Sequence, residues 1–229
     1  MKPVQSSRGQ RNQAMDRLTA LLLDDRSINF YIAVMTSPKK SELTRSRILC
    51  EGRALVLAQG FGGLGLTELL TAAGVPKGSF YYYFASKEAF GCDMLNAYVG
   101  DYLAALDAII ARPLPANERL DSFFRAALEG DAGSMADRCL VVKLAAEIAD
   151  LSEDMRQILD EGVTAVCDRL ARLLREGADD GSIVPQDDPG SAAALLYSQW
   201  LGAAIIAKLS RRPQPLEQAL ADTRRRFFA

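Results

Sequence analysis

Apolar positions recur every three or four residues along most of the chain, which is the spacing of one face of an α-helix. The segment 66–73 shows this on a small scale, with its leucines and Ala73 on one side. After residue 90 the same period extends over longer stretches separated by short polar breaks. The sequence contains neither convincing strand-like alternation nor an internal repeat. The pattern predicts an all-α protein.

Capping residues and helix breakers predict where the long helices begin and end. Ser86, Ser152 and Asp188 precede apolar periodic segments, and such side chains accept hydrogen bonds from the first amides of a helix. Gly181 suits a helix end, because glycine tolerates the left-handed conformation found there. We expect a loop around residues 131–137 and long helices over 88–111, 117–129, 139–149, 153–178, 189–210 and 213–228.

The segment 74–90 reads Gly-Val-Pro-Lys-Gly-Ser-Phe-Tyr-Tyr-Tyr-Phe-Ala-Ser-Lys-Glu-Ala-Phe and differs from an ordinary core helix. Three adjacent tyrosines are poorly suited to a core, because each buried hydroxyl needs a partner. Gly74 ends the preceding helix, Pro76 suits the first turn of the next, and Phe80 and Phe84 share one face that we assign to the core. Two short helices joined by a tight glycine turn predict a helix-turn-helix, whose second helix enters the major groove of DNA.

The segment 44–90 resembles the DNA-binding domain of the tetracycline-repressor (TetR) family of one-component regulators. The resemblance implies a three-helix reader that binds a palindromic operator in double-stranded DNA, followed by a helical bundle for ligand binding and dimerisation. The matching residues are Ile48-Leu49, Ala54, Gly60-Phe61, Leu66-Thr67-Glu68-Leu69-Leu70, Ala73-Gly74-Val75, Lys77-Gly78-Ser79-Phe80-Tyr81, Tyr83-Phe84 and Ser86-Lys87-Glu88.

Three segments follow along the chain. We expect residues 1–40 to be an N-terminal extension that is disordered or results from a mis-assigned start, with translation beginning at Met35; the alternative is a genuine extension that is partly helical around 15–23. We assign residues 41–87 to the helix-turn-helix DNA-binding domain and residues 88–229 to the regulatory and dimerisation domain.

The composition excludes several function classes. The chain has 229 residues, four cysteines and no histidine, so a Ser-His-Asp triad, a Cys-His pair and a His-ligated zinc site are ruled out within it. Without a CxxC pair or a glycine-rich nucleotide loop, we expect no metal, no cofactor and no enzymatic activity. We assign the acidic cluster Glu147, Asp150, Glu153 and Asp154 to helix capping and solvated charge.

The sequence also predicts where the protein works. No stretch of eighteen uninterrupted apolar residues occurs, so we expect no membrane span. No signal peptide is recognisable, and four scattered cysteines favour free thiols, so we expect a cytoplasmic protein.

The distribution of charge supports binding to DNA although the net charge is −2. Residues 36–90 hold seven lysines and arginines against four glutamates, a balance of +3, while residues 91–229 carry −7. A basic reader on an acidic body concentrates the attraction to phosphates where it is needed.

The resemblance implies which side chains meet DNA. Lys77, Gly78, Ser79, Tyr81 and Tyr82 line the exposed side of the recognition helix. Lys77 can reach guanine O6 or N7, and Gly78 lets the backbone approach closely. Tyr82 departs from the family pattern, since many relatives have histidine there, so the base preference at that contact stays open.

Three further residues are expected at the DNA backbone. Tyr81 and Tyr83 can donate to phosphates, and Thr67 would hold the backbone next to the recognition helix. Lys87 and the free amides after Ser86 are predicted to form a phosphate site at a helix start.

The body resembles the branch of the family that senses N-ethylmaleimide and related electrophiles. The resemblance implies that Cys139 is the sensor and that Lys208 can couple to its oxidised sulfur. The matching residues are Cys139-Leu140-Val141-Val142-Lys143-Leu144, Ala146-Glu147, Asp150-Leu151-Ser152-Glu153-Asp154-Met155-Arg156, Trp200-Leu201-Gly202-Ala203, Ala207-Lys208 and Pro215-Leu216-Glu217.

Residue chemistry points the same way more weakly. Cys139 begins a predicted helix, whose free amides favour a thiolate, and Arg138 and Lys143 add positive charge nearby. A thiolate adds to electrophilic alkenes, and its sulfenic acid can condense with a nitrogen. Two plainer alternatives stay open: Cys139 as an inert buried thiol, and Lys208 as a solvated side chain.

The other cysteine positions differ from those of some relatives, and a second mode of induction is possible. Some relatives carry a second cysteine ten residues after the sensor, where this chain has Ala149, so that disulfide is not possible here. We assign Cys50, Cys92 and Cys167 to the core. A different branch of the family binds acrylate-like small molecules non-covalently, and this is the alternative mode of induction.

The last two predicted helices carry a wide apolar face. In the family these helices pair with their symmetry mates as a four-helix bundle, so the resemblance implies a homodimer. Core packing alone would explain the same face, which comprises Ala192, Leu195, Leu196, Trp200, Leu201, Ala204 and Ile205.

Overall fold

The computed structural model describes residues 40–129 and 134–229, and the expectations for residues 1–39 lie outside these ranges. Helices account for almost all regular structure in the described part, which confirms the all-α prediction; the sole β pairing there is an isolated bridge between Ile183 and Phe228. The helices are α3 (Lys40–Gln59), α4 (Leu66–Ala72), the 3-10 turn η1 (Lys77–Ser79), α5 (Phe80–Tyr83), α6 (Lys87–Ile110), α7 (Ala116–Glu129), α8 (Met135–Arg138), α9 (Leu140–Leu151), α10 (Glu153–Asp180), α11 (Pro189–Ser210) and α12 (Gln214–Phe227).

The predicted caps form as expected. The side chains of Ser86, Ser152 and Asp188 accept hydrogen bonds from the first amides of α6, α10 and α11. Gly74 and Gly181 both have positive φ, at 63° and 75°. The long helices therefore begin and end within two residues of their predicted bounds, because their limits are set by local chemistry.

Two local predictions were wrong. Residues 131–133 of the expected loop lie outside the described ranges, but its described part, 134–137, forms most of the four-residue helix α8, which a capping box of Ser134 and Asp137 stabilises. The recognition segment is no continuous helix but η1 followed by the single turn of α5.

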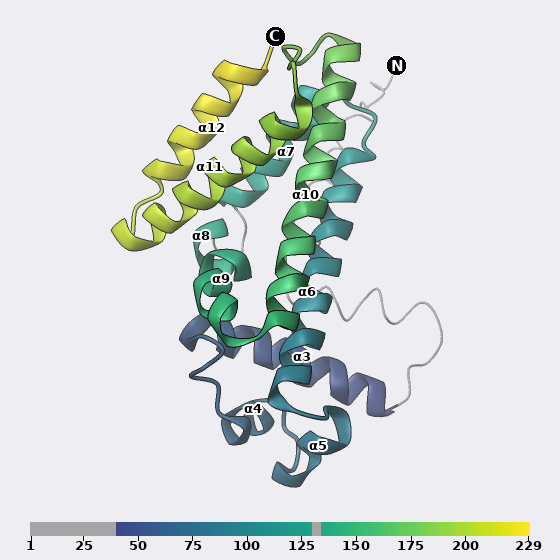
Figure 1. Cartoon of the computed structure of the whole chain (residues 1–229), viewed down its shortest axis with the longest axis vertical. Helices are drawn as coiled ribbons and strands as arrows, with labels where there is room; N and C mark the ends of the chain where they lie inside the picture. The colour runs from purple at the N-terminus through teal and green to yellow at the C-terminus, as the bar shows by residue number, and fades with distance from the viewer. Residues whose placement is uncertain (1–39, 130–133) are drawn as a thin grey trace, which may run out of the picture.

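The chain folds into a small lower unit and a larger upper bundle, joined by α6 (Figure 1). The lower unit contains α3, α4, η1, α5 and the beginning of α6. Its core includes Ile48, Leu69, Phe80, Phe84 and Phe90, all at most 2% exposed. The same hydrophobic cluster continues to Leu144 and Ile148 of α9, so α9 packs on the lower unit.

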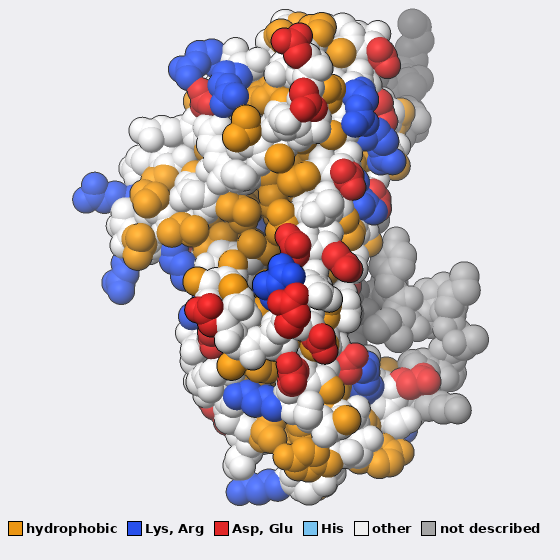
Figure 2. Space-filling view, in the orientation of Figure 1, with side chains coloured by type: hydrophobic (Ala, Val, Ile, Leu, Met, Phe, Trp, Pro, Cys, Tyr) orange, Lys and Arg blue, Asp and Glu red, His pale blue; other side chains and the backbone are white. Residues whose placement is uncertain are grey.

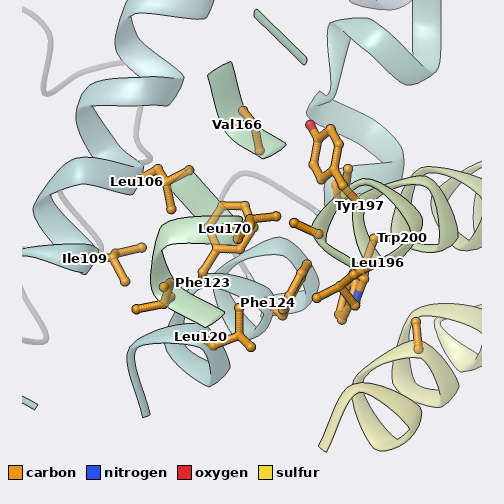
Figure 3. Close-up of a cluster of buried hydrophobic side chains, with 14 of the residues drawn as sticks. Leu106, Ile109, Leu120, Phe123, Phe124, Val166, Leu170, Leu196, Tyr197 and Trp200 are labelled. Atoms are coloured by element: carbon orange, nitrogen blue, oxygen red, sulfur yellow. The ribbon is translucent and has the colours of Figure 1, made fainter. Parts of the chain in front are cut away.

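The upper bundle has its own core around α6, α7, α10 and α11 (Figure 3). Trp200 is fully buried and stacks on Phe124, with ring centroids 4.3 Å apart. Gly162 of α10 allows α6 to approach closely, since a Cβ there would lie 2.8 Å from Cγ2 of Val99. These contacts fix the frame from which α6 extends into the lower unit.

Helix α11 leaves much of its apolar surface exposed. By length and hydropathy it could cross a membrane, although no such span was expected, and one third of its apolar window is buried within the chain. Core helices of soluble proteins can have the same length and hydropathy, although they are mostly buried. Hydrophobic side chains over α11 are visible at the surface in Figure 2. The exposed ones are Leu195, Ile205, Ile206 and Leu209.

Candidate functional site

Two buried phenylalanines hold the predicted DNA-reading segment against the lower core. The rings of Phe80 and Phe84 lie 5.4 Å apart, and Phe84 meets Phe90 of α6 edge-on at 5.1 Å. The guanidinium of Arg45 covers Phe84 at 5.1 Å and also pairs with Asp93 of α6. Aromatic packing therefore gives the short reading segment a rigidity that its length alone would not provide.

The opposite side of this segment faces solvent. Tyr81 and Tyr82 are 71% and 76% exposed, and Lys77 and Gly78 are exposed beside them. An added Cβ at Gly78 would meet no atom within 4 Å, so the protein itself leaves this side open. The structure thus brings the predicted groove residues together at the lower end, where Figure 2 shows basic and hydrophobic side chains at the surface.

The residues expected at the DNA backbone differ in their exposure and in their contacts within the protein. Thr67 is exposed at the beginning of α4, and Tyr83 is half-buried. Ser79, expected on the exposed side of the recognition helix, is also half-buried. The ammonium of Lys87 faces the loop after α3: its Nζ donates to the carbonyl of Gly62 at 3.4 Å and lies 5.1 Å from the ring of Phe61. The predicted phosphate contact of Lys87 would compete with these contacts inside the protein.

The sequence suggested that the whole acidic cluster is solvated, but the structure shows that its members differ. Asp150 is exposed, and Glu153 pairs with Arg156 on the surface of α10, as expected. Glu147, however, accepts hydrogen bonds from the amides of Phe61 and Gly62 in the lower unit. Its assignment to solvated charge was wrong, because its partners lie 86 and 85 residues away in sequence.

Cys139 lies at the N-cap of α9, as predicted, and is 5% exposed. The hydroxyl of Tyr98 from α6 lies 3.7 Å from its Sγ and can donate to it. The same hydroxyl accepts a hydrogen bond from the amide of Leu140 at 3.3 Å. One tyrosine therefore contacts both the sulfur and the first turn of α9.

The sequence predicted that its surroundings favour the thiolate of Cys139, but the net effect in the structure is to raise its pKa. Burial raises the pKa of the Cys139 thiol, and this outweighs the amides of Val142 and Val141, the Tyr98 hydroxyl and the charge of Lys208, which act in the opposite direction. Lys143 is not among the groups that shift this pKa, and its Nζ donates to the carbonyl of Ala58 at 3.3 Å. The protonated thiol is the resting form of this site.

Lys208 lies against the short helix that precedes Cys139. Its Nζ donates to the carbonyl of Ala136 at 2.9 Å, and its charge is close enough to lower the pKa of Cys139. The structure therefore brings the two predicted sensor residues into one neighbourhood although they come from different helices.

Three tyrosines lie near the thiol, and the sequence did not single them out: Tyr98 and Tyr197 are buried, and Tyr102 is half-buried. Burial raises the pKa of Tyr98, Tyr102 and Tyr197, so their hydroxyls stay protonated at neutral pH. They line a cavity of about 10 Å³, which has room for about one water molecule. The four-residue spacing of Tyr98 and Tyr102, which places them on one side of a helix, was the feature of the sequence that could have predicted this. The cavity is also lined by Val99, Leu103, Val141, Leu159, Gly162, Val163 and Val166.

The three cysteines other than Cys139 are all partly exposed to solvent: Cys50, Cys92 and Cys167 are half-buried. Cys92 packs against the core of the lower unit and Cys167 against that of the upper bundle, so their assignment to the core holds in part. Burial raises the pKa of the Cys92 and Cys167 thiols as well. Within the described ranges, no group of three or more histidine, cysteine or acidic side chains could hold a metal ion.

Comparison with known proteins shows similarity over nearly all of the described chain. Residues 48–90 match the family described as "Bacterial regulatory proteins, tetR family", and residues 116–223 match "Tetracyclin repressor-like, C-terminal domain". The chain is 41% identical over 184 residues to the HTH-type transcriptional repressor NemR of Escherichia coli, covering 79% of this chain and 92% of NemR. It is 34% identical over 189 residues to the transcriptional regulator AcuR of Cereibacter sphaeroides, covering 82% and 86%.

A solved structure shows the same fold. The crystal structure of the reduced form of E. coli NemR superposes with a TM-score of 0.75 at 39% identity, covering 80% of this chain and 96% of that one.

Proposed function

Because the chain belongs to the TetR family of bacterial transcriptional regulators, whose members bind DNA operators and act as dimers, we propose that it is a repressor that leaves its operator when an electrophile or oxidant modifies Cys139. Residues 41–87 read DNA, and residues 88–229 sense the signal and form the dimer in the cytoplasm. The observation that carries the proposal is the position of Cys139 at the N-cap of α9, in contact with Tyr98 of the helix that extends into the reader.

The exposed side of η1 and α5 supports the proposed mode of DNA binding. Lys77 and Gly78 come first in this segment, and the N-terminal residues of a recognition helix contact base edges. Ser79, Tyr81 and Tyr82 follow along the segment, and Tyr81 and Tyr83 can donate to phosphates. A short segment braced by buried phenylalanines can hold these groups in one orientation during docking.

The exposed apolar side of α11 supports a homodimer. Ile205, Ile206 and Leu209 are 45%, 53% and 77% exposed on a helix whose other side is buried against α10 and α12. Pairing of this side with its symmetry mate removes the patch from water. Two readers held in this way can bind half-sites about one DNA turn apart on a palindromic operator.

The chemistry at Cys139 follows from the thiolate that forms when the thiol loses its proton. For N-ethylmaleimide, Sγ bonds to one alkene carbon, the carbon–carbon π bond breaks, and the other carbon takes a proton from solvent. With a two-electron oxidant, the sulfur becomes a sulfenic acid, which can condense with the amine of Lys208 with loss of water.

Modification must displace neighbouring groups. Cys139 is 5% exposed and its Sγ lies 3.7 Å from the hydroxyl of Tyr98, so a maleimide adduct cannot fit without moving Tyr98 or the beginning of α9. Tyr98 lies on α6, which begins in the reader at Lys87. A shift of α6 changes the separation of the two reading segments, and a preference of about 2–3 kcal/mol for the released state lowers operator occupancy severalfold to a hundredfold.

Electrophoretic mobility of the protein on its own upstream DNA, with and without N-ethylmaleimide, tests the proposal. We expect the reagent to abolish binding by the wild type but not by Cys139→Ser. If both proteins lose binding equally, Cys139 is not the sensor.

The second candidate is a regulator induced by a small acrylate-like ligand bound without a covalent bond. The tyrosines Tyr98, Tyr102 and Tyr197 favour it, since hydroxyl groups can donate to a carboxylate, and the present cavity of about 10 Å³ would have to widen to admit the ligand. Intact-mass measurement separates the two modes: covalent sensing adds the mass of the inducer at Cys139, whereas reversible binding adds none and persists in Cys139→Ser.

A further inference from the structure

Helix α9 contacts the reader through two charged side chains spaced one turn apart. The carboxylate of Glu147 accepts hydrogen bonds from the amide of Phe61 at 3.2 Å and from the amide of Gly62 at 2.5 Å. The ammonium of Lys143 donates to the carbonyl of Ala58 at 3.3 Å. Both contacts fall where α3 ends and the loop towards α4 begins, and α9 lies directly above α3 in Figure 1.

The loop has the shape required to receive this carboxylate. Gly60 has a φ of 85°, which side chains rarely permit. A Cβ on Gly60 would lie 2.9 Å from Oε2 of Glu147, and a Cβ on Gly62 would lie 3.0 Å from Oε1. Glycine at these positions lets the backbone approach an anion and present its amides to it.

The charges are matched to the groups they contact. The carbonyls in the last turn of α3 lack partners within the helix, and its C-terminal end carries partial negative charge, which suits the ammonium of Lys143. The free amides of the following loop suit the carboxylate of Glu147. On the other side, Lys87 of α6 donates to the carbonyl of Gly62, so the loop is contacted from both α6 and α9.

We propose that Lys143 and Glu147 are positioning residues that hold the reader in its operator-binding orientation and carry the signal from Cys139 to it along α9. Cys139, Lys143 and Glu147 are four residues apart in succession, so they follow one side of the helix. Displacement of the beginning of this short helix moves both charged groups against the loop. The transmission step rests on the proposed function, whereas the positioning role applies to the unmodified protein.

The test uses Glu147→Gln in the full-length protein, with Asp150→Asn as the matched control. Both changes remove one negative charge from α9, but Asp150 is exposed and lies outside the contact with the loop. Fluorescence anisotropy measures the dissociation constant on operator DNA before and after complete alkylation of Cys139, and mass spectrometry verifies the alkylation. Hydrogen–deuterium exchange follows the peptide containing Phe61 and Gly62.

We expect Glu147→Gln to bind operator at least about fivefold more weakly than Asp150→Asn, since the reader loses its fixed orientation. Exchange at Phe61 and Gly62 should accelerate only in Glu147→Gln. Alkylation should then weaken its binding further by less than about twofold, because the orientation is already lost. Lys143→Met should change binding in the same direction and serves as the second variant if Glu147→Gln folds poorly.

Equal operator affinity and equal exchange in Glu147→Gln and Asp150→Asn would overturn the positioning role. The transmission role would be overturned if Glu147→Gln binds operator as tightly as the wild type and alkylation then abolishes its binding. If the wild type does not respond to alkylation, the proposed electrophile sensing fails, and the affinities of the unmodified variants still decide whether Glu147 positions the reader.

Discussion

The reactivity of Cys139 should rise steadily with pH through the neutral range. Only the thiolate attacks maleimides, and an ordinary thiol with a pKa near about 8.5 is roughly 3% ionised at pH 7. Burial raises the pKa of Cys139 above its ordinary value, so the ionised fraction is smaller still. The alkylation rate should therefore increase about tenfold per pH unit from about pH 6.5 to 8.5 without levelling off.

Replacement of Tyr98 by phenylalanine probes the cause of the remaining reactivity. The hydroxyl of Tyr98 lowers the pKa of Cys139, and its distance of 3.7 Å from the sulfur places it at the weak end of hydrogen bonds to charged groups. Such a bond contributes roughly 1.5 kcal/mol. In Tyr98→Phe the pKa of Cys139 should rise further, so the midpoint of the rate profile should move to higher pH.

A second consequence of the same change acts on the rate differently. The amide of Leu140 loses its acceptor, which costs about 1–3 kcal/mol and loosens the beginning of α9. Easier opening raises the rate equally at every pH, whereas the altered pKa moves the midpoint. The full pH profile therefore separates the two effects, which a single measurement at one pH would not.

Peptide-resolved mass spectrometry at timed intervals gives the rate at each cysteine. Cys92 and Cys167 are half-buried and serve as internal references within the same sample. A wild-type rate that levels off below about pH 8 would refute the dominance of burial, because it would show a lowered pKa. An unchanged midpoint in Tyr98→Phe would refute the role of its hydroxyl.

Three further changes test other parts of the structure. Lys77→Ala should lose about 1–3 kcal/mol of binding free energy on operator DNA and far less on random DNA, whereas Lys87→Ala should weaken binding to both evenly. Fluorescence anisotropy on the two DNAs measures this, and equal losses for Lys77→Ala would exclude base reading. Gly162→Ala should lower the free energy of unfolding by about 1–3 kcal/mol, because its Cβ meets Val99 at 2.8 Å; urea unfolding followed by the fluorescence of Trp200 measures this, and unchanged stability would show that the helices can move apart. Leu209→Glu should raise the dimer dissociation constant at least about tenfold, because it places an unpaired charge in the apolar surface; sedimentation velocity measures it, and an unaltered dimer would place the interface elsewhere.

The sequence by itself determined the helices, their caps and the reader. The period of apolar residues, the capping side chains of Ser86, Ser152 and Asp188 and the glycines that end helices act over a few residues, so they can be read without the fold. The assignment of Phe80 and Phe84 to the core is confirmed for the same reason, since their four-residue spacing already defines a face. The residues that match the TetR family lie in these locally determined segments.

Only the tertiary structure decided the properties that depend on distant partners. The environment of Cys139 contains amides that favour a thiolate, as its sequence position suggests, but burial under α6 reverses the net effect on its pKa. Glu147 looked solvated because its partners at Phe61 and Gly62 are more than eighty positions away. Desolvation and long-range hydrogen bonds arise when separate helices pack together, so neither leaves a signal in the local sequence.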